Sequence, residues 1–188
     1  MAQVVNTNQF KNGMAIEVDG ENYTIVEWQH VKPGKGGAFV RTKLKSIASG
    51  AVIDRTFRAG EKFNRVHTES RKMQYLYATD DEVVLMDGQT YEQVSVPPAL
   101  AEDALKWVVE NMEVELQYVN GQPFAVEPPT FVELDVVRAE PGLRGDTAQG
   151  GSKPVTLQTG VTIQVPLFIE QGERIKVDTR TGQYLSRA

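Results

Sequence analysis

The sequence predicts a nearly all-β protein built from three small barrel-like units. Three observations support this: apolar runs of period two recur from end to end, turn dipeptides separate them, and only one segment has helical periodicity. Asp-Gly or Asn-Gly stands between such runs at residues 19–20, 87–88 and 120–121, and Gly182 marks a fourth turn. These dipeptides are strong hairpin signals, because their residues adopt positive φ at low cost.

Shifts in composition divide the chain into units 1–64, 65–127 and 128–188. A basic segment ends near Asn64, where an acidic run of strands begins, and Pro128-Pro129 predicts an extended connection before the third unit. Units of this size bury only about 60% of their unfolded surface. Closed barrels and contacts between units are therefore expected.

The helical candidate spans residues 97–112. Pro97-Pro98 is a suitable start, and Leu100, Ala104, Trp107 and Val108 fall on one helical face. We expect a short helix packed across the mouth of a small barrel.

Charge is distributed unevenly along the chain. The net charge is −5, but residues 1–64, 65–127 and 128–188 carry +3, −8 and 0. Net acidity argues against a general nucleic-acid binder, because phosphate affinity comes mainly from lysine and arginine. The basic residues of the first unit gather between positions 30 and 62: Lys32, Lys35, Arg41, Lys43, Lys45, Arg55, Arg58 and Lys62.

Several chemistries are excluded by composition. The chain has no cysteine, so it forms no disulfide, thiolate nucleophile or cysteine zinc site. His30 and His67 are too few for a histidine metal cluster and have no nucleophile motif beside them, so we expect neither a metal site nor a catalytic centre. No apolar run reaches about 18 residues and the N-terminus lacks a signal-peptide pattern, which predicts a cytoplasmic protein with no membrane contact.

The stretch VKPGKGGAFV, residues 31–40, isolates one lysine between glycines. Pro33 stiffens the approach, while Gly34, Gly36 and Gly37 leave Lys35 without packed neighbours. A Walker A phosphate loop is excluded, since Gly36 and then a strand follow the lysine instead of Ser or Thr and a helix. Two interpretations remain: a surface turn, or a lysine directed at a partner.

The strand after this loop carries a basic ladder. Period two places Phe39, Arg41, Lys43 and Lys45 on one face, and Val40, Thr42 and Leu44 on the other. With Lys32 before the loop, the ladder predicts contacts to RNA phosphates that position the protein without reading sequence. The alternative is a solvated strand face.

A second candidate is the glycine-rich loop of residues 139–160. It contains Arg144, Asp146, Thr147 and Lys153. A loop this long in a compact unit is typically functional or disordered. The alternative is a local turn held by the Asp146 and Thr147 side chains.

Several segments together resemble the bacterial elongation factor P family. They are KPGKGGAFV with its basic strand, SRKMQYLYATDDEVVLMDGQTYEQ, GLRGDTAQGGSKPVTLQTG and the ending VPLFIEQGERIKVDTRTGQYLSRA. The resemblance runs from Asn8 to Ala188 and extends more distantly to the archaeal and eukaryotic factor whose loop lysine becomes hypusine. It implies an SH3-like (KOW-like) domain followed by two OB folds, in an L-shaped arrangement like that of transfer RNA.

The resemblance also implies a function without catalysis. A monomeric, non-enzymatic translation factor would bind the 70S ribosome between the P and E sites, through ribosomal RNA and proteins. There it would position peptidyl-tRNA, stimulate peptide-bond formation and relieve stalling at consecutive prolines. The family's tip lysine falls on Lys35, within the tip loop Pro33, Gly34, Gly36 and Gly37, and its small-subunit contact falls on Gly145, Asp146 and Thr147, next to Arg144.

The same resemblance implies a covalent extension of Lys35, added by a lysine-modifying enzyme, and no other cofactor. A competing hypothesis from a different class is a sequence-neutral RNA-binding module that stacks bases on aromatic side chains. Tyr75, Tyr77 and Tyr91 are available for this, but they lie in the acidic unit, which disfavours binding of free strands.

Overall fold

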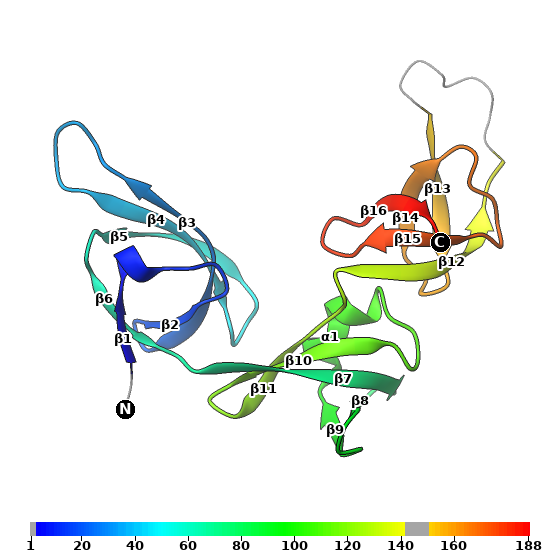
Figure 1. The fold of residues 1–188 in the computed structure, drawn as a ribbon, viewed down its shortest axis with the longest axis horizontal. Helices are drawn as coiled ribbons and strands as arrows, with labels where there is room; N and C mark the ends of the chain where they lie inside the picture. The colour runs from blue at the N-terminus through cyan, green and yellow to red at the C-terminus, as the bar shows by residue number, and fades with distance from the viewer. Residues whose placement is uncertain (1–2, 142–150) are drawn as a thin grey trace. The chain divides into compact units, whose positions relative to one another are not determined.

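The computed structural model describes residues 3–141 and 151–188, and these form three antiparallel sheets, each curled on itself (Figure 1). Tertiary contacts group residues 1–69 and 118–124 into one compact unit, and residues 70–117 and 125–188 into a second. The predicted all-β class is confirmed. Within the described ranges, no helix has the length and apolar character needed to cross a membrane.

The first sheet has six strands in the order β1-β6-β2-β3-β4-β5. Its strands are β1 (Gln3–Asn6), β2 (Ala15–Val18), β3 (Glu21–Val31), β4 (Phe39–Ser46), β5 (Val52–Arg58) and β6 (Lys62–Arg65). A 3-10 turn, η1 (Thr7–Gln9), follows β1 and is capped by the Asn6 side chain, which accepts from the Asn8 amide at 2.9 Å. At residues 19–20 both φ angles are positive, so the predicted two-residue hairpin turn between β2 and β3 is confirmed.

The core of the first sheet lies beneath the β3–β4 hairpin. Phe10, Phe57 and Phe63 pack with ring centroids 4.6–6.4 Å apart, and Val40 and Leu44 of β4 are fully buried beside them. This apolar support fixes the strand that leads out of the glycine-rich loop.

The second sheet has the order β11-β10-β7-β8-β9. Its elements are β7 (Thr68–Ala78), β8 (Val83–Asp87), β9 (Gln93–Val96), the helix α1 (Pro98–Leu105), β10 (Glu113–Val119) and β11 (Gln122–Glu127). Asn120 and Gly121 both have positive φ between β10 and β11, as predicted for a tight hairpin. Between β8 and β9 the link is longer, residues 88–92, and the Asp87 side chain caps it by accepting from the Gln89 and Thr90 amides.

The predicted helix of residues 97–112 is too long, since α1 ends at Leu105. Beyond it, Trp107 and Val108 still donate to the Ala104 carbonyl, and the chain then turns at Asn111, whose φ is +72°. Val108 is buried, as predicted, but Trp107 packs against the third sheet instead of sharing that face. The helix therefore ends before its apolar periodicity does.

The third sheet has the order β14-β13-β12-β15-β16. Its strands are β12 (Phe131–Ala139), β13 (Ser152–Leu157), β14 (Thr162–Pro166), β15 (Arg174–Asp178) and β16 (Gln183–Arg187). Leu134, Leu157, Ile169 and Ile175 are fully buried in its centre. Gly182, with φ of +67°, turns β15 into β16 at the predicted position.

Candidate functional site

The β3–β4 hairpin presents Lys35 at its tip. Val31 pairs with Phe39 to close the hairpin, and residues 32–37 beyond this pair are all exposed. Gly36 has φ of +110°, so only glycine fits there without strain, and a Cβ added at this position would lie 3.9 Å from the Pro33 ring. Figure 1 shows this loop at one end of the first sheet. The local sequence therefore folds into a tip that holds Lys35 in solvent.

Lys35 has no internal partner in the part of the chain that the structure describes. No side-chain hydrogen bond or ion pair joins residues 32–37 to any described residue, although the chain has 25 acidic side chains. The tip is held by the backbone of the hairpin and by the glycine and proline geometry. Its amine is therefore available to an external group or to covalent modification.

The basic ladder on β4 has the predicted alternation. Arg41 and Lys45 are exposed and Lys43 is half-buried, whereas Val40, Thr42 and Leu44 are buried. The ladder is not uniformly available, because the Lys43 ammonium lies 3.2 Å from the Glu27 carboxylate on β3. The Glu27 carboxylate offsets part of the positive charge of Lys43, although an exposed ion pair of this kind is itself weak.

Two ladder cations have no carboxylate partner within residues 3–141 and 151–188. The Arg41 guanidinium lies over the Phe39 ring, 5.6 Å from its centroid, and Lys45 forms no ion pair. The stacked arrangement holds the arginine in place while leaving its donors free. Lys32, Lys35, Arg41 and Lys45 are thus the available cations of this hairpin.

A shallow groove of about 410 Å³ crosses β3, β4 and β5 at the ladder. It is lined by Glu27, Trp28, Gln29, Arg41, Thr42, Lys43, Asp54, Arg55 and Thr56. Trp28 is 38% exposed, and sequence reasoning missed it. The sequence did carry a signal for its exposure, because Trp28 stands between the polar residues Glu27 and Gln29. These residues belong to the exposed part of β3.

The second predicted site lies outside the described residues, because Arg144, Gly145, Asp146 and Thr147 fall in the range 142–150. The strands on either side are described: β12 ends at Ala139 and β13 begins at Ser152. Lys153 is buried and its ammonium donates to the Glu140 carbonyl at 3.0 Å. This lysine therefore ties the two strand ends together instead of facing solvent.

The histidines and the tyrosines considered for base stacking differ in exposure. His30 is half-buried and His67 exposed, and among the described residues no group of three His, Asp or Glu side chains gathers to hold a metal ion. Of the tyrosines considered for base stacking, Tyr77 and Tyr91 are exposed and Tyr75 is half-buried, where burial raises the pKa of its hydroxyl.

Family models of elongation factor P match the chain in three consecutive segments. The KOW-like domain model matches residues 6–63, the OB domain model residues 68–126 and the C-terminal model residues 132–187. The chain belongs to the elongation factor P family. An elongation factor P from Moorella thermoacetica is 55% identical over 98% of this chain and its own full length. One from a Thermoanaerobacter species is 54% identical, with equal coverage.

A solved structure extends the relationship to a second translation factor. It is described as eukaryotic translation initiation factor 5A from Methanococcus jannaschii, is 30% identical, and covers 66% of this chain and 94% of its own, with a TM-score of 0.50. The chain is thus a member of a translation factor family with KOW-like and OB domains that is related to initiation factor 5A.

Proposed function

We propose that this elongation factor P family member binds the ribosome between the P and E sites and relieves stalling at consecutive prolines. The observation that carries the proposal is Lys35, an exposed lysine on a glycine-shaped tip with no partner among the described residues. Family membership supplies the translational context. We place this activity in the cytoplasm. We also propose that the three domains span residues 1–64, 65–127 and 128–188.

The proposed mechanism is positioning of substrates. Proline restricts both the attacking nitrogen and the nascent chain, so the two substrates rarely reach a reactive geometry. Holding the peptidyl-tRNA in place lowers the entropic part of this barrier, and good orientation is worth up to about 7–11 kcal/mol in favourable cases. In this mechanism no acid or base from the protein is needed.

The charge distribution supports a division of labour among the domains. Lys32, Arg41 and Lys45 have no carboxylate partner among the described residues and offer cations for the phosphates of tRNA or ribosomal RNA. Residues 65–127 carry a net charge of −8, which suits contact with basic ribosomal proteins. We assign the small-subunit contact to Gly145, Asp146 and Thr147, with Arg144 beside them, by their match to the family's loop.

We further propose that Lys35 carries a covalent extension added by a lysine-modifying enzyme. Its amine is exposed, and the open loop around it lets an enzyme approach. An extension would lengthen the reach of the tip toward the acceptor end of the tRNA. Peptide mass spectrometry of the natively expressed, active protein tests this: added mass on Lys35 is expected, and an unaltered Lys35 contradicts it.

Translation in vitro tests the proposed function as a whole. A message encoding Pro-Pro-Pro is translated with and without the protein, beside a matched message encoding Ala-Ala-Ala. We expect stimulation of the first message and little change in the second. If the protein stimulates neither and instead binds unstructured single-stranded RNA tightly, the alternative RNA-binding module is the correct reading.

A further inference from the structure

The segment that follows α1 belongs by its backbone to the second sheet. The Asn111 amide donates to the Tyr75 carbonyl at 2.7 Å, and the Tyr75 amide donates to the Met112 carbonyl at 2.9 Å. Ala104 and Val108, just before, are buried. The main chain of residues 107–112 is therefore fixed to β7 at one end and to α1 at the other.

The side chains of this same segment pack on the third sheet. Trp107, Val109 and Met112 are partly buried against the cluster that contains Leu134, Leu157 and Ile175. At Gly182, in the β15–β16 turn, a Cβ atom would lie 3.5 Å from the Trp107 ring, so the ring lies directly over this glycine. Trp107 and the third sheet belong to the same compact unit, residues 70–117 and 125–188.

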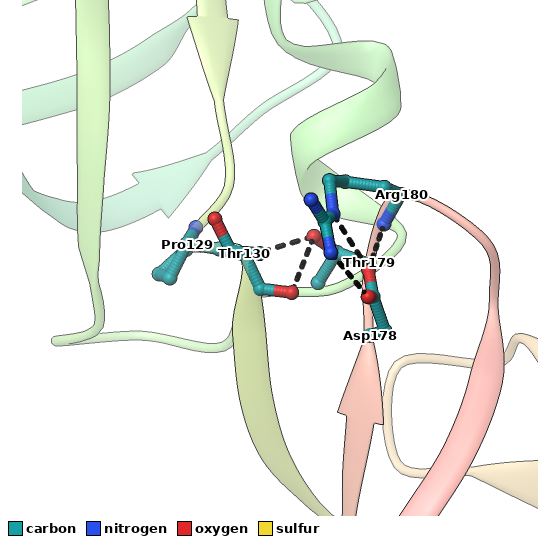
Figure 2. A network of polar contacts seen from close by, with 5 residues as sticks. All are labelled: Pro129, Thr130, Asp178, Thr179 and Arg180. Atoms are coloured by element: carbon teal, nitrogen blue, oxygen red, sulfur yellow. Dashed lines mark hydrogen bonds and ion pairs between the residues drawn. The ribbon is translucent and has the colours of Figure 1, made fainter.

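The β15–β16 turn is also fixed by hydrogen bonds of Asp178 and Thr179 (Figure 2). The buried Asp178 carboxylate accepts from the Arg180 amide at 3.0 Å and from its guanidinium at 3.1 and 2.7 Å. Thr179 donates through its hydroxyl to the Pro129 carbonyl at 2.8 Å and through its amide to the Thr130 carbonyl at 3.0 Å. The turn is therefore bonded to the connection that enters β12.

We propose that Trp107 and the turn Asp178–Gly182 form an interdomain clamp that makes the second and third sheets one rigid body. The tryptophan comes from the segment after α1, the turn comes from the third sheet, and the turn is bonded to the Pro129-Thr130 connection. A hinge motion that moved the third sheet away from α1 would therefore break the contact of Trp107 with Gly182. Trp107, Thr179 and Gly182 are positioning residues, since none of them needs to touch RNA.

A rigid pair of domains would help the protein to bind the ribosome. This benefit of the clamp rests on the proposed function. A factor that spans two ribosomal sites binds more tightly when its domains are already ordered, because less freedom is lost on binding. The clamp fixes the domain that carries residues 145–147 relative to the acidic domain. The clamp itself is a property of the free protein and can be measured without ribosomes.

The chain is suited to a direct distance measurement because it has no native cysteine. Gln89→Cys and Glu170→Cys place one spin label on an exposed position of each domain, away from the clamp. Pulsed electron resonance then reports the distribution of distances between the labels. We expect a narrow distribution in the parent and a clearly broader one after Trp107→Ala. An unchanged distribution in a folded Trp107→Ala protein overturns the proposal.

A glycine pair separates the clamp from general destabilisation. Gly182 and Gly172 both have positive φ, +67° and +89°, so valine strains the backbone at either position. Only at Gly182 does the added side chain meet the Trp107 ring, since nothing lies within 4 Å of a Cβ at Gly172. We expect Gly182→Val to broaden the distances and Gly172→Val to leave them narrow. Equal effects of the two substitutions overturn the proposal.

Discussion

Two glycine-containing turns of this chain are built in opposite ways. The loop of residues 32–38 makes no side-chain hydrogen bond or ion pair with any residue that the structure describes, whereas the turn Asp178–Gly182 bonds its polar side chains and covers its glycine with a tryptophan ring. The difference indicates where each turn acts. A turn with internal partners holds domains together, and a turn whose lysine has none is available to an external partner.

The largest loss of stability is expected from a substitution at Leu44, which is fully buried on β4, the strand that follows the first turn. Leu44→Ala removes core contacts that support β4 and should lower the free energy of unfolding by about 2–5 kcal/mol. Lys45→Ala, the next residue on the opposite face, should change it by less than about 0.5 kcal/mol. Urea unfolding of the two variants measures the contrast, and similar losses would show that the alternation on β4 does not separate core from surface.

A smaller loss of unfolding free energy is expected from a substitution in the second turn, Asp178–Gly182. Thr179→Val keeps the side-chain shape but loses the hydroxyl bond to the Pro129 carbonyl, which costs about 1 kcal/mol. Thr130→Val is the matched control, because only the carbonyl of Thr130 takes part in the network and its side chain is exposed. Equal unfolding free energies for the two variants in urea would mean that the hydroxyl bond does not stabilise the turn.

Acid should weaken the second turn. The hydrogen bond from Arg180 is the main cause that lowers the pKa of Asp178, and the Gln89 and Thr90 amides lower the pKa of Asp87 in the same way. A lowered folded pKa means that the stabilisation is complete above the unfolded value of about 3.9 and is lost as the pH falls through the folded pKa.

The pH test compares the parent with Asp178→Asn. The parent should lose more unfolding free energy than the variant between about pH 5 and pH 2, because the variant has no carboxylate to protonate at this position. Urea titrations at a series of pH values give both slopes. Parallel slopes would contradict a role for Asp178 in acid sensitivity.

Local signals predicted much of the fold. The dipeptides at 19–20 and 120–121 set hairpin turns by their own backbone preferences, and the alternation on β4 follows from the geometry of a half-buried strand. The tip residues around Lys35 could also be read directly, because glycine and proline act through the chain on either side of them.

Longer-range features could not be read from the sequence. The ion pair of Lys43 depends on a register shift between Ile25 and Glu27 on β3, which brings Glu27 opposite Lys43. Just beyond the end of α1, Trp107 contacts the third sheet at Gly182, 75 residues further along the chain. The apolar periodicity of one segment predicts neither a bulge in its partner strand nor a contact with a distant domain.

The central claim is that Lys35 acts on a partner and contributes nothing to the fold. It is tested most directly by translating the Pro-Pro-Pro message with Lys35→Ala, beside Lys11→Ala as an exposed-lysine control from the same domain. We predict that Lys35→Ala loses most of the stimulation while its free energy of unfolding stays within about 0.5 kcal/mol of the parent. Full stimulation by Lys35→Ala, or the same loss in Lys11→Ala, would contradict the account.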